Sequence, residues 1–199
     1  GGEDLLELLE DYNNRAQGHS NYMPDFSNLS DVQENPAEGL LLRGAHGPIE
    51  LLEEASAVDQ EAIRRCLDII ISGQRMDLER FQDKDGTGIR SLSRYEEMDD
   101  YAYRVAGSVG EFWTEICLEH AFEASAELKE ELMSSGVRFG KALQLINILR
   151  DIPEDLEIGR CYIPTDDLEK IGLSPNDLLH SDSIDVFRPL LDQYLSLIH

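Results

Sequence analysis

Hydrophobic residues recur at three- and four-residue steps along most of the chain, and this period predicts helices. Four long patterns of this kind occupy residues 48–71, 95–126, 127–152 and 184–198. Proline, glycine, asparagine and serine gather in residues 18–35 and 82–93, which predicts loops there. No segment alternates between polar and apolar residues as a half-buried strand would, and no internal repeat is visible. The pattern predicts an all-α helical bundle, with residues 1–199 forming a single domain.

Both ends of the sequence fall inside helical patterns. Leu5 and Leu9 belong to such a pattern at the start, and Leu190, Tyr194 and Ile198 continue another to the end without a stop signal. The sequence therefore reads like a segment of a longer protein, truncated at both ends.

Charge and cysteine content narrow the range of functions. The chain of 199 residues has 17 basic and 41 acidic residues and a net charge of −24, which opposes nonspecific binding to nucleic acid. Its three cysteines form no Cys-x-x-Cys pair, as is typical of reduced thiols in the cytoplasm. No signal peptide and no apolar segment of membrane-spanning length is visible. These properties predict a cytoplasmic protein without a nucleic-acid partner.

Two aspartates one helical turn apart are the most informative chemical feature. Asp151 and Asp155 are the only aspartates four residues apart, and Asn147 extends the same face by another turn. Carboxylate and amide oxygens suit a Mg²⁺ ion that also binds phosphate oxygens. Arg150 beside them is a permanently charged fork for a diphosphate. The alternative is an exposed helix whose acids have no ligand.

Pro153 lies between the two aspartates. It removes one backbone donor and disfavours helical geometry at Ile152, so we expect a kink or local overwinding. The alternative is a plain helix end, with Asp155 in the following turn.

Three segments together resemble a known family. They are Gln144-Leu-Ile-Asn-Ile-Leu-Arg-Asp-Ile-Pro-Glu-Asp155 with Gly159-Arg-Cys-Tyr-Ile-Pro164, then Tyr101-Ala-Tyr-Arg-Val-Ala-Gly-Ser-Val-Gly110, and Gly73-Gln-Arg-Met-Asp-Leu-Glu-Arg-Phe81. The first resembles the second aspartate-rich motif of the squalene and phytoene synthases, the second their Tyr-x-x-x-Val-Ala-Gly-x-Val-Gly motif, and the third their Gly-Met-x-x-Asp segment. The resemblance is clearest over residues 40–199.

The resemblance implies the isoprenoid synthase fold and an enzyme that joins two prenyl diphosphates head to head, with Mg²⁺ assisting release of diphosphate. The product would be squalene or another C30 hydrocarbon from farnesyl diphosphate, with NADPH needed for squalene, or phytoene from geranylgeranyl diphosphate. An apolar product would favour peripheral association with a membrane. A terpene cyclase and a non-catalytic helical module that binds a prenyl lipid or a protein partner are the alternatives. The oligomeric state stays open.

The resemblance also implies roles for individual residues. Tyr101 and Arg150 would be catalytic, and the metal ligands would be Asp151, Asp155 and Asn147, with Glu154 as a helper. The substrate-binding residues would be Met76, Phe81, Arg104, Val105, Gly107, Asn147, Arg150, Arg160 and Tyr162.

Each of these assignments has a purely structural alternative. The small residues of 101–110 would serve tight helix packing, Tyr101 would be a buried phenol, and Arg160 with Tyr162 would form either a lid or a packed connection. Asp77 is expected to be a solvated acid, and Trp113 to lie in a core. Arg104 departs from squalene synthases, where this position is often aromatic, so the product is less certain than the reaction class.

One family feature is missing. Members carry a first aspartate-rich motif on an earlier helix, and this sequence contains no second Asp-x-x-x-Asp. Because the sequence starts inside a helical pattern, we expect that motif to lie upstream of residue 1. Residues 1–199 alone would then lack half of the metal site and be inactive.

Overall fold

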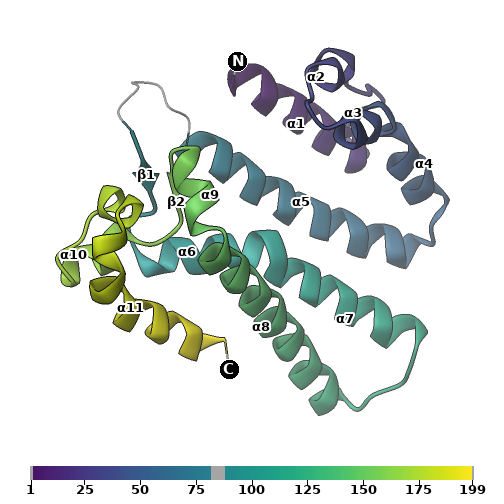
Figure 1. Ribbon diagram of the computed structural model, residues 1–199. Helices are drawn as coiled ribbons and strands as arrows, with labels where there is room; N and C mark the ends of the chain where they lie inside the picture. The colour runs from purple at the N-terminus through teal and green to yellow at the C-terminus, as the bar shows by residue number, and fades with distance from the viewer. Residues whose placement is uncertain (1, 82–87, 199) are drawn as a thin grey trace. The chain divides into compact units, whose positions relative to one another are not determined.

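The computed structural model describes residues 2–81 and 88–198, and helices dominate it (Figure 1). About 76% of the structure is helical, which confirms the all-α prediction. The chain divides into two compact units, Gly1–Arg75 and Met76–His199, and helix α5 (Ala57–Arg80) contains the boundary. The single domain expected over residues 1–199 stays a prediction. Among the described helices, none is both long and apolar enough to cross a membrane.

The first unit is built from helices with a small apolar core. They are α1 (Gly2–Ala16), α2 (Ser27–Asp31), α3 (Pro36–Arg43), α4 (His46–Glu54) and most of α5. Ala16, Ile49 and Leu52 are buried together, because the apolar faces of α1 and α4 meet here. The Tyr12 hydroxyl donates a hydrogen bond to the carbonyl of Ala45 at 3.1 Å, which ties α1 to the start of α4.

Two predictions in this unit were wrong. The helix expected from Pro48 to residue 71 is divided into α4 and α5, because the Ser56 hydroxyl accepts the backbone N–H of Asp59 and starts a new helix there. The loop expected over 18–35 contains the short helix α2, whose first N–H, on Ser27, bonds to the side chain of Asp25 at 2.9 Å.

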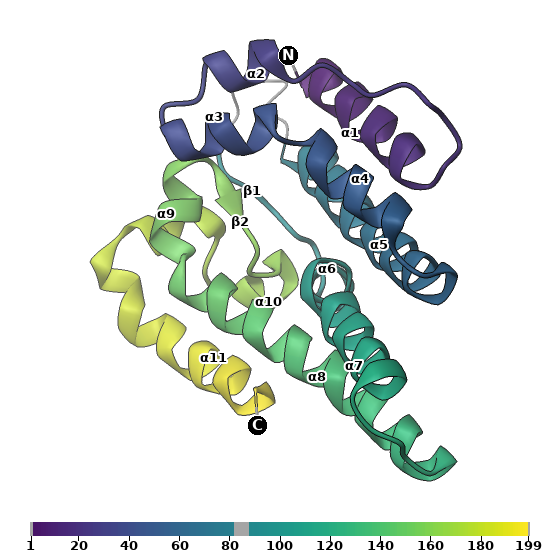
Figure 2. The ribbon, with the colours of Figure 1, turned by 90° about the vertical axis from the view of Figure 1, so that its right-hand side faces the viewer.

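The second unit contains the longer helices. After the end of α5 come β1 (Arg90–Ser91), α6 (Tyr95–Ala102), the π-helix η1 (Tyr103–Gly107), α7 (Ser108–His120), α8 (Ala126–Arg150), α9 (Ile152–Glu157), β2 (Arg160–Cys161), α10 (Thr165–Lys170), the 3₁₀ turns η2 (Pro175–Leu179) and η3 (Ser181–Ser183), and α11 (Ile184–Leu197). Helix α8 packs against α7 on one side and contacts α11 (Figure 2). The most deeply buried side chains include Ile163, Leu168 and Tyr194.

A short parallel strand pair was not predicted. Arg90 pairs with Arg160 and Ser91 with Cys161, so β1 forms inside the loop expected over 82–93. Two residues per strand are too few to show alternation in the sequence. Residues 82–87 of that loop lie outside the described part of the chain.

The small residues after Tyr101 bring two helices into backbone contact. A Cβ atom added at Gly110 would lie 2.0 Å from the carbonyl oxygen of Gly136, and one at Gly140 would lie 2.2 Å from the carbonyl oxygen of Ala106. The small residues of 101–110 therefore serve tight packing against α8, which was the structural alternative for this segment. Helix packing accounts for these glycines and for their cost in helix propensity.

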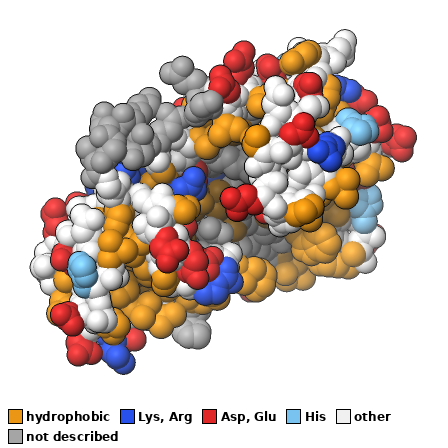
Figure 3. All heavy atoms as spheres, turned by 45° about the horizontal axis from the view of Figure 1, so that its top comes forward, with side chains coloured by type: hydrophobic (Ala, Val, Ile, Leu, Met, Phe, Trp, Pro, Cys, Tyr) orange, Lys and Arg blue, Asp and Glu red, His pale blue; other side chains and the backbone are white. Residues whose placement is uncertain are grey.

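Several large apolar side chains of the second unit are exposed. Trp113 is 67% exposed and Phe139 is 64% exposed, so the core position expected for Trp113 was wrong. Acidic side chains recur across the face drawn in Figure 3, with hydrophobic side chains exposed between them. Apolar residues on a helical face need not be core residues, because periodicity alone does not say what covers that face.

Cys161 gives the fold a measurable pH dependence. Burial raises the pKa of its thiol to about 11, whereas an unfolded cysteine titrates near ~8.5. Because the folded chain holds this proton more tightly, stability should fall as pH rises above ~8.5, by up to about 1.4 kcal/mol per pH unit. Urea unfolding between pH 8 and 10.5 should show that Cys161→Ala lacks this component, whereas Cys117→Ala, at a partly exposed site, keeps it. Equal slopes in Cys161→Ala and the unmodified chain would contradict the prediction.

Candidate functional site

The two aspartates lie on either side of a helix break. Helix α8 ends at Arg150, and Asp151, with φ −94° and ψ 11°, caps both α8 and the following α9. Pro153 occupies the first turn of α9, where its missing N–H costs nothing. The N–H of Asp155 still bonds to the carbonyl of Asp151 at 2.9 Å. The structure thus shows the alternative, a helix end with Asp155 in the following turn, rather than a kink within one helix, and a turn-like spacing of the two aspartates is kept.

Arg150 binds Asp151 through one edge of its guanidinium group. Its Nε and Nη2 atoms donate to the two carboxylate oxygens at 2.6 and 2.7 Å. The pKa of Asp151 lies below its ordinary value, first because of these hydrogen bonds. The Arg150 side chain is 65% exposed, so the ion pair is open to solvent. Arg150 can therefore release the Asp151 carboxylate and bind another anion of similar geometry.

The pKa of Asp155 is shifted in the opposite direction to that of Asp151. Partial burial raises the pKa of its carboxyl group, the negative charge of Asp151 raises it further, and Arg160 opposes the shift. A carboxylate that is destabilised by a neighbouring carboxylate marks a place where a cation would be favourable.

The donor set fits Mg²⁺ as a partial site. Among residues 2–81 and 88–198, no group of three His, Cys, Asp or Glu side chains is arranged to hold a metal ion. Mg²⁺ binds through one or two carboxylates and takes its remaining ligands from water and substrate phosphates. Asp151 and Asp155 offer this kind of set.

A cluster of aromatic rings and one ion pair adjoins the aspartates. Tyr101 stacks on Tyr162 with centroids 4.8 Å apart, and Phe81 meets Tyr162 edge-on at 5.0 Å. The guanidinium of Arg160 lies 5.8 Å from the centre of the Phe81 ring. Asp77 accepts hydrogen bonds from Tyr162 at 2.5 Å and from Arg160 at 2.6 Å. Four predicted site residues thus lie in one cluster, and two of them, Arg160 and Tyr162, bind Asp77.

Asp77 joins this candidate site through contacts that the sequence interpretation missed. Its side chain is only 14% exposed and is bonded on both oxygens, so the expectation of a solvated acid was wrong. The available signal was its place in the Gly73–Phe81 segment. That segment resembled a family motif, but nothing in it indicated partners more than 80 residues away.

Both tyrosines of the cluster stay protonated. Burial raises the pKa of Tyr101, and the hydrogen bond with Tyr162 only partly offsets this. The pKa of Tyr162 is raised much further, again mainly by burial. Tyr162 is 8% exposed and lies in the main core, which favours a packed connection over a lid for this residue.

The remaining predicted residues occupy the neighbouring helices. Arg104 pairs with Asp100 one turn before it at 2.8 Å, and Val105 lies in the same π-helix. Gly107 is buried, and a Cβ there would lie 3.0 Å from Lys141 of α8, so its position is explained by packing. Met76 lies near the end of α5, and Asn147 accepts the N–H of Asp151 with its backbone carbonyl. Their substrate contacts stay predictions.

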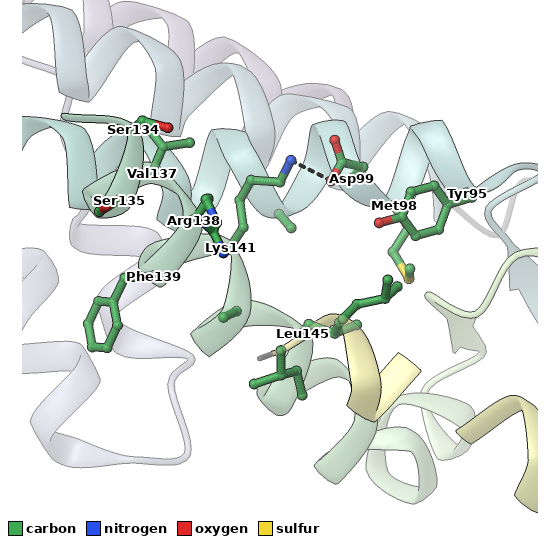
Figure 4. Close-up of a pocket in the computed structure, with 14 residues that line it drawn as sticks. Tyr95, Met98, Asp99, Ser134, Ser135, Val137, Arg138, Phe139, Lys141 and Leu145 are labelled. Carbon is green, nitrogen blue, oxygen red and sulfur yellow. Dashed lines mark ion pairs between the residues drawn. The ribbon is translucent and has the colours of Figure 1, made fainter. Parts of the chain in front are cut away.

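A cavity of about 730 Å³ opens between α6, α8 and α11. Met98 and Leu145 supply apolar walls, and Lys141 forms an ion pair with Asp99 inside it (Figure 4). None of the predicted site residues is among the described residues that line it. The cavity is therefore a separate feature from the aspartate pair.

Comparison with known proteins decides the family. The model of the squalene/phytoene synthase family matches residues 10–199. This chain belongs to the squalene/phytoene synthase family. It is 36% identical over 126 residues to 15-cis-phytoene synthase from Synechocystis, covering 61% of this chain and 35% of the relative. It is 33% identical over 163 residues to phytoene synthase 1 from Arabidopsis thaliana, covering 78% and 34%. The chain thus spans about a third of the length of these relatives.

Solved structures show the same fold. The squalene synthase HpnC from Alicyclobacillus acidocaldarius aligns with a TM-score of 0.51 and 20% identity, over 96% of this chain and 66% of that structure. A dehydrosqualene synthase in complex with ligand aligns with a TM-score of 0.53 and 20% identity, over 96% and 63%. The all-α isoprenoid synthase fold expected for a squalene/phytoene synthase is therefore confirmed.

Proposed function

We propose that this squalene/phytoene synthase chain supplies the second aspartate-rich side of an enzyme that condenses two prenyl diphosphates head to head. The observation that carries the proposal is the Arg150–Asp151–Asp155 arrangement at the α8–α9 break, beside the partly buried aromatic cluster of Tyr101. Anion-binding and cation-binding groups would then lie next to aromatic rings.

At the α8–α9 break, the acidic residues would bind a cation and Arg150 would bind the diphosphate. Asp151 and Asp155, with Asn147 next to them, would hold Mg²⁺, which when bound neutralises negative charge developing on the leaving diphosphate. Arg150 can move its fork from Asp151 to diphosphate oxygens, because the pair is exposed and geometrically matched to either anion. With a cation held there, Asp151 would have a second partner for its charge, and Arg150 would be available to the diphosphate.

The aromatic cluster would contact the prenyl chain. Tyr101, Phe81 and Tyr162 pack on one another and would form an aromatic wall that excludes water, which Met76 and Val105 would extend. Removing water protects an allylic cation from hydrolysis and strengthens the electrostatic terms around it. Tyr101 stays a neutral phenol, so it adds a dipole without adding a charge.

The relatives favour a C20 substrate. Curated relatives at 33–38% identity carry phytoene synthase in their names, whereas the squalene-type structures share only 20% identity. We therefore place geranylgeranyl diphosphate and phytoene ahead of farnesyl diphosphate and squalene. NADPH would then play no part.

Product analysis tests this proposal. The protein expressed from its complete gene would be incubated with Mg²⁺ and either prenyl diphosphate, with and without NADPH, beside residues 1–199 alone. We expect Mg²⁺-dependent release of diphosphate and a C40 hydrocarbon from the C20 substrate. A monomeric hydrocarbon would indicate a cyclase, a C30 product would reverse the substrate order, and ligand binding without diphosphate release would indicate a non-catalytic module.

A further inference from the structure

We propose that Asp77 is a positioning residue that fixes the direction of a hydroxyl chain ending at Tyr101. This inference rests on the proposed function, because it assigns a task to the phenol beside the reacting prenyl group. The chain consists of three groups from three separate segments: Asp77 on α5, Tyr162 after β2 and Tyr101 on α6.

The Asp77 carboxylate is held on both sides. Arg160 donates to its Oδ2 at 2.6 Å, and the Tyr162 hydroxyl donates to its Oδ1 at 2.5 Å. Arg160 is itself placed by the Phe81 ring and by the β1–β2 pairing. The Asp77 side chain is 14% exposed, and its Oδ2 is held by the ion pair with Arg160. Its Oδ1 therefore has a fixed direction toward Tyr162.

The direction of the next hydrogen bond follows from counting protons. A phenol has one proton to donate, and that of Tyr162 is used on Asp77. Tyr101 must therefore be the donor in the 3.5 Å contact between the two hydroxyls. The contact is long for a hydroxyl pair, and the stacked rings hold it in place at a centroid distance of 4.8 Å.

The consequence concerns what Tyr101 offers to a ligand. With its proton directed at Tyr162, its oxygen presents lone pairs, and the negative charge of Asp77 polarises both hydroxyls in the same sense. Lone pairs stabilise a positive carbon, whereas an outward O–H would favour the diphosphate. Asp77 thus assigns Tyr101 to the carbocation.

Asp77→Asn reverses this polarity with little change in shape. Arg160 would keep the amide oxygen, so the amide NH₂ would face Tyr162 and donate to it. Tyr162 would then donate to Tyr101, whose proton would point away from the pair. We expect kcat for diphosphate release to fall about tenfold, which corresponds to about 1.4 kcal/mol, with KM little changed. Asp77→Glu should recover part of the loss.

A double-variant comparison separates positioning from general support of the fold. In a Tyr101→Phe background, Asp77→Asn should cause no further loss of kcat, because the hydroxyl through which it acts is gone. Glu97→Gln is the matched control. Glu97 accepts a hydrogen bond at 2.8 Å from Arg80, which lies one turn after Asp77 on α5, and it is not part of the hydroxyl chain. It should leave kcat unchanged. An additional loss in the Tyr101→Phe background would overturn the proposal.

A spectroscopic measurement decides the inference even if the protein has no turnover. The tyrosines, of which residues 1–199 contain seven, would be labelled with ¹³C at Cζ, and Tyr101 would be assigned by the signal lost in Tyr101→Phe. Asp77→Asn should shift the signals of Tyr162 and Tyr101, and in a Tyr162→Phe background it should leave Tyr101 unmoved. An unmoved Tyr101 signal in Asp77→Asn alone would refute the hydroxyl chain, whereas absent turnover with the expected shifts would count only against the proposed reaction.

Discussion

Replacing Asp151 by asparagine should reduce Mg²⁺-dependent diphosphate release by the full gene product about a hundredfold, the usual cost of removing one well-placed electrostatic group. The amide keeps the shape but removes the charge that a hard cation needs. It also frees Arg150, which would bind diphosphate oxygens without the metal. We therefore expect kcat to fall much more than the affinity for the prenyl diphosphate, as measured by steady-state kinetics and isothermal titration.

The fold should be almost unaffected by this change. The Arg150–Asp151 pair is exposed to solvent, and exposed pairs contribute little to stability. Thermal melting of the variant should match that of the unmodified protein. Glu157→Gln, at the exposed end of the helix that Asp151 caps, is the control that removes an acid without touching the site and should retain full activity. Unchanged turnover in Asp151→Asn would remove this aspartate from the proposed metal site.

Replacing Gly110 by alanine should be strongly destabilising, although alanine is the better helix former. The added Cβ would lie 2.0 Å from the carbonyl oxygen of Gly136, and that neighbour is backbone on a packed helix. Relieving the contact requires α7 and α8 to separate. We expect a loss of about 2–3 kcal/mol in the free energy of unfolding, measured by urea denaturation, since overpacking of this kind exceeds the gain in propensity.

Gly47→Ala provides the matched comparison. Gly47 lies in the first turn of α4, and a Cβ there would meet nothing within 4 Å apart from its chain neighbours. Because the next residue is Pro48, whose ring crowds a preceding Cβ in a helix, the gain in helix propensity is offset, and we expect a change within about 1 kcal/mol. If Gly110→Ala destabilised the protein no more than Gly47→Ala, the close α7–α8 packing would be wrong.

The helices could be predicted because their information is local. Apolar positions at three- and four-residue steps identified α7, α8 and α11. Pro153 indicated a disturbed helix near the aspartates, although the structure has a helix end there rather than the expected kink. The division at Ser56 depended on a single capping hydroxyl, which a long apolar period conceals. The β1–β2 pair depends on contacts between segments about 70 residues apart, so no local pattern reveals it.

The same distinction explains the outcome for the site. Asp151, Asp155 and Arg150 are close in sequence, and their arrangement could be anticipated from helix geometry. Asp77 could not, since its partners Arg160 and Tyr162 are 83 and 85 residues away. Trp113 was misassigned for the converse reason: its side chain has the chemistry of a core residue, and only the tertiary structure shows that it is exposed.

The π-helix η1 (Tyr103–Gly107) changes the phase between the helices on either side of it. A π-turn carries one more residue than an α-turn, so it rotates everything after it by about 100° relative to an uninterrupted helix. Because of this rotation, one continuous stretch of chain can direct Tyr101 to the aromatic cluster and Gly110 to the backbone of α8. Loss of a single residue within 103–107 would bring the two faces back into phase, and either the phenol or the glycine contact would then be displaced. The extra residue thus makes the position of Tyr101 in the aromatic cluster and the contact of Gly110 with α8 depend on each other.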